Sequence, residues 1–150
     1  MRRVLALAAM MALSLAGGAF ATEVEVKMLN KGQDGPMVFE PALVKIAPGD
    51  TVKFVSVDKG HNAESVPGML PEGATPFSGK VSQDLVVTFD KPGVYGYRCT
   101  PHYGMGMVGI VAVGDAVSED KAKAVSHPGK ANQAFSNLFC KLADTKSAMN

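Results

Sequence analysis

The chain has 150 residues, which favours one domain with a substantial apolar core over two smaller ones. It carries 15 basic and 14 acidic residues, and this near balance excludes the strongly basic composition typical of nucleic-acid-binding proteins. Any electrostatic recognition must therefore come from where the charges are placed rather than from their sum.

Residues 1–21 have the pattern of a secretory signal peptide. Two arginines precede the apolar run 4–15, and Ala19 and Ala21 match the small residues of the A-x-A cleavage pattern. The apolar run is short for a transmembrane anchor, and no charged stop-transfer flank follows it. We therefore expect cleavage after Ala21, export to the periplasm and no membrane anchor. The mature chain, residues 22–150, keeps 13 basic and 14 acidic residues, a net charge of −1.

The first part of the mature chain predicts β-strands separated by turns. Between Thr22 and Asn30 apolar and charged residues alternate, which predicts an outer strand of a sandwich with one buried and one solvent-exposed face. Residues 30–36 are rich in turn formers and predict a loop. Further strands, separated by prolines and glycines, are predicted at residues 37–40, 42–47 and 51–57.

The middle of the chain continues the β pattern after an irregular stretch. Prolines and glycines in 67–76 predict irregular structure after a short strand at 63–66. Strands then follow at 84–90 and 94–98, and the almost wholly apolar run 108–113 predicts a strand buried between two layers. Many short strands between turn signals predict a mainly β fold, a Greek-key β-sandwich over residues 22–114.

The tail, residues 115–150, predicts two C-terminal α-helices. Ser118 can cap the first helix, with Glu119 and Asp120 near its positive dipole end, and Pro128-Gly129 would end it. The second helix carries one apolar face, which must pack on another part of the protein. Its residues recur at steps of three and four: Ala131, Ala134, Phe135, Leu138, Phe139 and Leu142.

A short loop between two predicted strands gathers the side chains that carry chemistry. Cys99 and His102 lie in the run C-T-P-H-Y-G-M-G-M, which also holds two methionines. Thiolate and thioether ligands select copper, and two histidines with one cysteine and a weak axial methionine form a blue-copper site. The second imidazole must come from outside the loop, and His61 in D-K-G-H-N is the obvious candidate. Spacing alone leaves Met105 and Met107 both open as the methionine ligand.

These motifs together resemble the pseudoazurins, a group within the cupredoxin family of type 1 blue-copper proteins. The resemblance rests on C-T-P-H-Y-G-M-G-M, the upstream G-H-N, M-L-N-K-G and M-V-F-E-P, and it covers the chain after the leader. It implies a helical tail packed on the sandwich. It also implies that Asn62 ties the two ligand loops together and that Met105 lies on the apolar surface around the site. One copper ion is then bound by His61, Cys99, His102 and Met107.

This ligand set favours electron transfer over catalysis. Four protein ligands leave no open position for a substrate or water, so we do not expect an enzyme. The resemblance implies a periplasmic shuttle, monomeric in function, that receives electrons from a cytochrome and donates them to a denitrification enzyme such as nitrite reductase. The alternative is a copper-storage protein, although the methionines are dispersed except at the loop. A copper oxidase or reductase would need further ligands, and only His127 is left over.

Charged residues near the ligand loops predict how a partner docks. A basic ring around the edge of His102, beside an apolar patch with Pro36 and Met37, would steer an acidic redox partner. The cations expected in this ring are Lys31, Lys59, Lys80 and Arg98.

Two residues outside the site complete the sequence-based expectations. A disulfide between Cys99 and Cys140 is disfavoured, because a ligand role explains the spacing of Cys99. On a helical wheel Cys140 lies opposite the apolar stripe, so its thiol should be exposed and open to intermolecular pairing. His127 precedes Pro128 at a predicted helix end and is expected at the surface.

Overall fold

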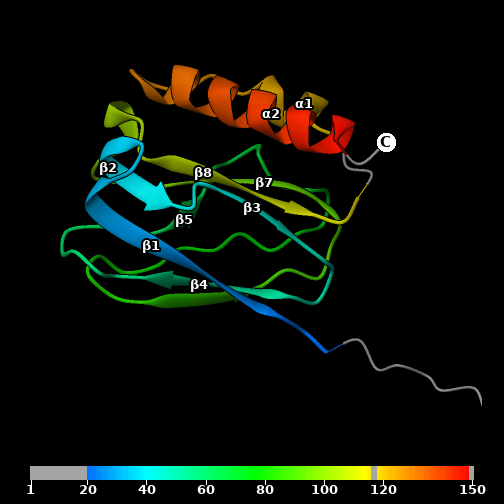
Figure 1. Cartoon of the computed structure of the whole chain (residues 1–150), viewed down its shortest axis with the longest axis horizontal. Helices are drawn as coiled ribbons and strands as arrows, with labels where there is room; N and C mark the ends of the chain where they lie inside the picture. Colours follow the sequence, from blue (N-terminus) through cyan, green and yellow to red (C-terminus); the bar gives the residue numbers. More distant parts are fainter. Residues whose placement is uncertain (1–19, 116–117, 149–150) are drawn as a thin grey trace, which may run out of the picture.

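Two four-stranded sheets pack face to face, and a long helix covers one of them (Figure 1). The computed structural model describes residues 20–115 and 118–148, so most of the predicted leader lies outside the described residues. The first sheet has the order β2 (Gly35–Glu40), β1 (Glu23–Gly32), β4 (Thr51–Val55) and β6 (Leu85–Thr88). The second has the order β3 (Leu43–Ile46), β8 (Val108–Val113), β7 (Gly93–Arg98) and β5 (Glu64–Ser65). The predicted mainly β sandwich is confirmed.

Strand pairing corrects the predicted place of the first strand. β1 is antiparallel to β2 on one side and parallel to β4 on the other, so it lies inside its sheet rather than at the edge. The loop predicted at residues 30–36 is shorter, because β1 and β2 form a hairpin that turns at Gln33 and Asp34. In the second sheet β3 runs parallel to β8. Both parallel pairs join segments that are far apart in sequence. The alternation of apolar and polar residues within one strand does not predict such pairing.

The core between the sheets follows the predicted alternation of apolar residues. On β1, Val26 and Met28 are fully buried, while Glu23 and Glu25 on the other face are exposed. Aromatic rings from both sheets meet edge to face in the middle, with ring centroids of Phe39 and Tyr97 4.8 Å apart and of Phe54 and Tyr97 5.0 Å apart. Such pairs add about 1 kcal/mol each beyond the area they bury.

β8 is buried on both faces, as its apolar run predicts. Val111 and Val113 face the core between the sheets, whereas Ile110 and Ala112 face the helical tail. The tail helix α2 (Ala131–Ser147) lies along this outer face (Figure 1), and its predicted apolar stripe is buried or half-buried there. Packing of the second helix on the sandwich is therefore confirmed. In the described part of the chain, no helix combines the length and apolar character needed to cross a membrane.

The first tail helix is shorter than predicted. α1 spans only Asp120–Lys123, and no side chain caps it. Glu119 lies at the position before it, 8% exposed, and its carboxylate accepts from Lys123 at 2.7 Å and from Lys146 of α2. The predicted role of Glu119 in the first turn is thus wrong, because its charge joins the two helices instead.

This ion-paired carboxylate predicts a pH-dependent contribution to stability. Burial raises the pKa of Glu119, but the bonds from Lys123 and Lys146 lower it more, so it lies below the ordinary value of 4.5. Glu119 therefore stabilises the fold fully above its unfolded pKa, and this contribution is lost as pH falls through the lower folded pKa. We expect Glu119→Gln to reduce the free energy of unfolding by about 2 kcal/mol at neutral pH. Denaturant titrations should find that difference gone in acid; a difference independent of pH would contradict the ion-pair assignment.

Candidate metal centre

The ligand loop begins and ends on two neighbouring strands. Cys99 directly follows β7 and Met107 directly precedes β8, and the Cys99 backbone N–H donates to the Met107 carbonyl at 2.9 Å. This bond extends the antiparallel ladder by one pair, so the sheet fixes both ends of the loop. Between them, the short helix η1 (Tyr103–Met105) forms the tip of the loop.

His61 reaches the same place from the loop between β4 and β5. Its carbonyl accepts the Ser82 backbone N–H at 2.8 Å, and the Ser82 hydroxyl accepts the N–H of Gly60 at 2.9 Å. The segment before β6 thus holds the backbone of His61 in place. His61 and Cys99 are fully buried, whereas His102 is half-buried.

The three predicted nitrogen and sulfur donors converge. His61 Nδ1 lies 3.1 Å from His102 Nδ1, and Cys99 Sγ lies 3.7 Å and 3.5 Å from these two nitrogens. A point equidistant from all three atoms lies about 2 Å from each, the usual length of a bond between a metal and imidazole nitrogen. Among the described residues this is the one such group of three. The donor set and its spacing fit one type 1 copper ion.

Asn30 sets the orientation of the buried imidazole. His61 Nε2 lies 2.8 Å from Asn30 Oδ1, which can only accept, so Nε2 carries the proton and Nδ1 offers its lone pair to the centre. Burial lowers the pKa of His61, and the neighbouring His102 lowers it further against the opposing charge of Asp58. Both effects favour the neutral imidazole that a metal binds. Asn30 belongs to the motif M-L-N-K-G, but the sequence did not predict this role for it.

The thiol of Cys99 lies in an environment that a metal would change. Burial raises the pKa of Cys99, while the backbone N–H groups of Asn62 and His102 that point at the sulfur oppose that rise. Without a metal the site therefore favours the neutral thiol. A bound metal ion stabilises the thiolate directly, so metal uptake releases a proton.

Asn62 joins the two ligand loops as expected. Its Oδ1 accepts the backbone N–H of Thr100 at 2.8 Å, and its Nδ2 donates to the Thr100 hydroxyl and to the Gly79 carbonyl, both at 3.1 Å. Hydrogen bonds of this kind orient the residues that bind the metal. The predicted tie between the segments of His61 and Cys99 is therefore confirmed.

Burial separates the two candidate methionines. Met107 is fully buried beside Cys99 in the core between the sheets, whereas Met105 is 52% exposed at the tip of the loop. Only the buried side chain lies on the core side of the loop with the thiol. Met107 as the fourth ligand stays a prediction, and Met105 lies on the surface as expected.

Replacing each methionine by leucine tests this assignment while preserving side-chain volume. We expect Met107→Leu to raise the reduction potential by about 60 mV, which is a tenfold change in the relative affinity for the two copper states. The reason is that a thioether donor supports Cu(II) more than Cu(I). Met105→Leu should leave the potential nearly unchanged in cyclic voltammetry. The opposite ranking would move the ligand to Met105.

His127 is the site-related residue that the sequence misplaced. It is only 9% exposed, its Nδ1 lies 2.6 Å from the Tyr103 hydroxyl, and its ring lies 4.3 Å from the ring of Phe135. The prediction of a surface position is wrong, because the segment before α2 folds back against the ligand loop. Cys140 is exposed, and both cysteines are free, as predicted.

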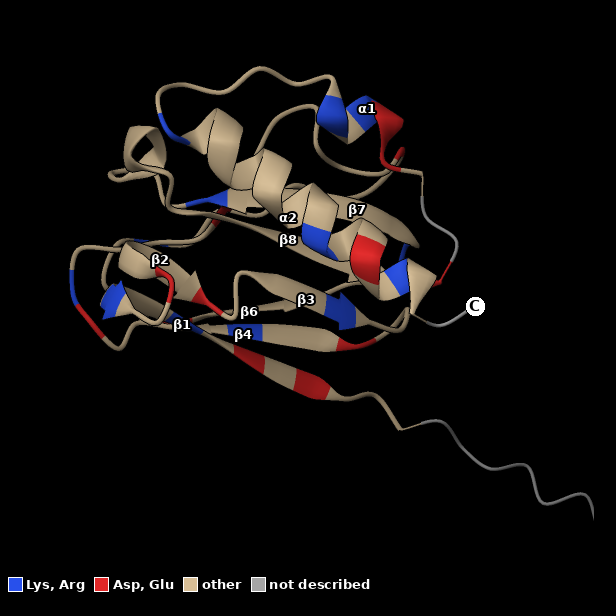
Figure 2. Ribbon diagram, turned by 45° about the horizontal axis from the view of Figure 1, so that its top comes forward, with Lys and Arg blue, Asp and Glu red and all other residues tan. Residues whose placement is uncertain are grey.

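The cations predicted around the site differ in their surroundings. Lys31, Lys59 and Lys80 are exposed. Arg98 is half-buried, because its guanidinium pairs with Glu64 at 2.7 Å and lies 4.9 Å from the centre of the Tyr103 ring. Figure 2 shows acidic positions on the N-terminal half of β1, at the opposite end of the sandwich from the ligand loops.

Lys130 is a further exposed cation at the ligand loop that sequence reasoning missed. Its backbone N–H donates to the Gly104 carbonyl at 3.0 Å. No local pattern indicates this proximity, because Lys130 precedes α2, far along the chain from the loop.

Comparisons with known proteins agree with this geometry. The family model described as "Copper binding proteins, plastocyanin/azurin family" matches residues 26–114. Pseudoazurin of Paracoccus pantotrophus is 51% identical over 130 residues, which cover 86% of this chain and 90% of the relative. Pseudoazurin of Methylorubrum extorquens is 48% identical over 143 residues, covering 93% and 97%. The crystal structure of pseudoazurin from Methylobacterium extorquens AM1 superposes with a TM-score of 0.77 at 50% identity, covering 80% of this chain and 98% of that one.

Proposed function

Because the chain belongs to the plastocyanin/azurin family of copper-binding proteins, we propose that it is a periplasmic carrier of single electrons. The convergence of two imidazole nitrogens and one thiol at a single buried point carries this proposal. A copper ion bound there supplies one-electron exchange between Cu(I) and Cu(II). With Met107 as the fourth donor, protein atoms fill the site, so electrons enter and leave through the ligands.

His102 is the ligand through which electrons pass to a partner. His61 is fully buried, whereas His102 is half-buried between the exposed residues Pro101 and the tip of the loop at Met105. Of the two imidazoles, it is therefore the one whose edge a partner can approach. Hydrogen bonds between Asn30 and His61 and between Asn62 and Thr100 hold the rest of the site, so its geometry changes little between the two redox states.

A copper-storage role is the alternative, and the described residues offer little for it. They contain one cluster of histidine, cysteine or acidic ligands, and their methionines are dispersed outside the loop. A storage protein would need several soft donors arranged for more than one ion.

A copper titration distinguishes the two roles. For an electron carrier we expect saturation at one copper per chain, an intense visible band from the thiolate and narrow hyperfine splitting in the EPR spectrum. Uptake of several ions without that band would favour storage and overturn the proposal.

The similarity to pseudoazurins supports a proposal for the physiological partners, and the leader and the surface charges support where and how they meet this chain. The residues at the N-terminus have the signal-peptide pattern, which supports a periplasmic location. We propose a cytochrome as the donor and a denitrification enzyme such as nitrite reductase as the acceptor. Because the charge of Arg98 is largely compensated by Glu64, we assign the basic ring around His102 to Lys31, Lys59, Lys80 and Lys130.

A further inference from the structure

The segment between the two tail helices lies directly against the tip of the ligand loop. His127 Nδ1 lies 2.6 Å from the Tyr103 hydroxyl, and the backbone N–H of Lys130 donates to the Gly104 carbonyl at 3.0 Å. Gly129 adopts φ +53°, and a Cβ atom there would lie 2.5 Å from the Gly104 oxygen. A side chain at Gly129 would clash with this oxygen, so only glycine allows the backbones of Gly129 and Gly104 to meet directly.

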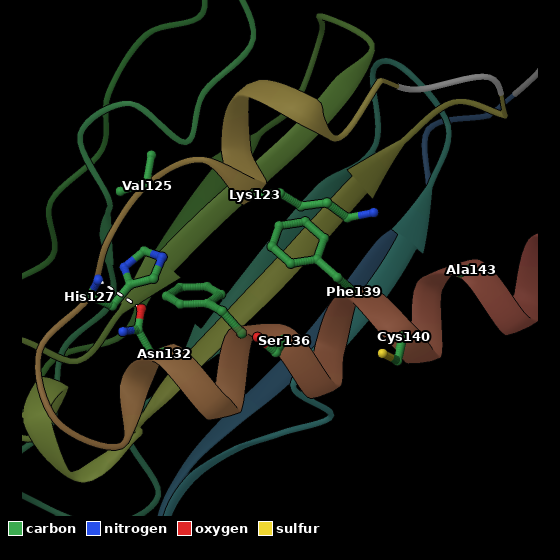
Figure 3. A pocket seen from close by; sticks show the side chains of 9 residues that line it. Lys123, Val125, His127, Asn132, Ser136, Phe139, Cys140 and Ala143 are labelled. Carbon is green, nitrogen blue, oxygen red and sulfur yellow. Dashed lines mark hydrogen bonds between the residues drawn. The ribbon is translucent and has the colours of Figure 1, made fainter.

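His127 is itself held rigidly on the tail. Its backbone N–H donates to Asn132 Oδ1 at 2.9 Å, which joins it to the first turn of α2. Figure 3 shows this bond and the position of the His127 ring at one end of a groove of about 370 Å³ along α2. The ring also contacts Phe135, which is buried against β8. The imidazole is therefore anchored to the same helix that covers the sheet.

Tyr103 makes a second contact, through its ring. The guanidinium of Arg98 lies 4.9 Å from the centre of its ring, and Arg98 is fixed by its 2.7 Å ion pair with Glu64. Tyr103 directly follows His102 in the chain. The backbone of His102 in turn accepts hydrogen bonds from Met105 and Met107 at 3.1 Å and 3.3 Å. Any displacement of Tyr103 would thus be transmitted to His102.

We propose that His127 is a positioning residue of the metal centre: by binding the Tyr103 hydroxyl, it ties the helical tail to the ligand loop and holds His102 in place. This deepens the proposed electron-carrier function and rests on it where it concerns copper. A loop held in one geometry needs less rearrangement when the charge of the site changes. The tail beyond β8 is then part of the redox site and not only a cover for the sheet.

Hydrogen exchange of the metal-free protein tests the tie independently of copper. We expect His127→Phe and Tyr103→Phe each to speed exchange of the Met105, Gly106 and Met107 amides by about fivefold, the effect of one lost hydrogen bond. The double variant should exceed neither single one, because both remove the same bond. His127→Gln, which can still bond to the hydroxyl, should restore much of the protection.

Leu142→Ala provides the matched control on the same helix. Leu142 is fully buried on the face of α2 that packs against β8. It lies in the second half of the helix, away from the ligand loop. It should loosen α2 without changing exchange in the loop. Equal loop exchange in wild type, His127→Phe and Tyr103→Phe would overturn the proposal, and so would equal loosening of the loop by Leu142→Ala.

The copper-loaded protein adds a second readout. We expect His127→Phe and Tyr103→Phe to shift the reduction potential in the same direction and Leu142→Ala to leave it unchanged. Potentials that are identical in all four proteins would overturn the role of His127 at the copper site. Failure of the proposed function would instead appear as a missing blue spectrum in the wild type, whatever the exchange rates of the loop.

Discussion

Cys99→Ser is expected to abolish the intense visible absorption of the copper-loaded protein completely. The band requires electron donation from a thiolate to Cu(II), and a serine hydroxyl supplies neither the soft sulfur nor an easily ionised oxygen. Cys99 is fully buried, and its sulfur lies 3.7 Å and 3.5 Å from the two histidine nitrogens, so no other thiol of the described residues can replace it there. Absorption and EPR spectra of the copper-titrated variant measure the loss.

Cys140→Ser is the matched control, because it makes the same chemical change at the other cysteine. Cys140 is exposed on α2 and takes no part in the site, so this variant should keep the full spectrum. An unchanged band in Cys99→Ser, or a lost band in Cys140→Ser, would contradict the assignment of the centre.

Cys99→Ser should also weaken the stabilisation that copper gives the fold. A ligand that binds only the folded state stabilises it by about 4 kcal/mol when present at a thousand times its Kd. Without the thiolate, copper affinity falls, so the rise in thermal midpoint on adding copper should be mostly lost in Cys99→Ser. Each protein is compared with its own metal-free form, so that the cost of burying the serine hydroxyl in the core is subtracted.

Local patterns in the sequence predicted most of the fold because each depends on near neighbours. The alternation around Val26 and Met28 and the apolar run from Val108 to Val113 directly reflect which faces are buried. The helical stripe of α2 is equally local, since residues three and four apart share a face. These patterns fix the type of each element and the face that it buries.

What the sequence could not predict depends on contacts between distant segments. The parallel pairing of β1 with β4 is set by the assembled sheet and leaves no trace in either strand alone. Glu119 looked like a helix-start residue, but its carboxylate is used by Lys146, which lies near the end of the chain. His127 looked like a surface residue, because only the folded tail brings it to Tyr103.

In the metal centre, too, the sequence predicted some residues and missed others. Cys99 and His102 were predictable because one short loop carries both, and His61 followed because few histidines are available. The loop alone did not distinguish Met107 from Met105, and the choice of Met107 came from the resemblance to the pseudoazurins. The residues that orient these ligands come from other parts of the chain. Asn30 on β1 reaches His61, and Lys130 reaches the ligand loop, through the tertiary fold.

Charge placement around His102 predicts that electron transfer to an acidic acceptor depends on salt. The cations that we propose for the ring are exposed, and Glu23 and Glu25 lie at the other end of β1 from Lys31. Such an asymmetric arrangement steers an acidic partner, although the net charge is close to zero. Screening shortens the range of these charges to about 10 Å at 0.1 M ionic strength. We therefore expect the second-order rate to fall about tenfold from low salt to salt well above that concentration.

Reversing one charge of this ring separates steering from docking by apolar contact. Lys59→Glu should slow electron transfer at low salt by about threefold or more and weaken its salt dependence, with the visible spectrum unchanged. Lys45→Glu makes the same charge change on β3 beside Gly114, where β8 ends, whereas the ligand loop lies where β8 begins. It should therefore have little effect in stopped-flow measurements with the same acceptor. If both reversals slow the reaction equally, net charge alone controls the rate; if neither does and salt has no effect, the exposed apolar surface around Met105 carries the docking.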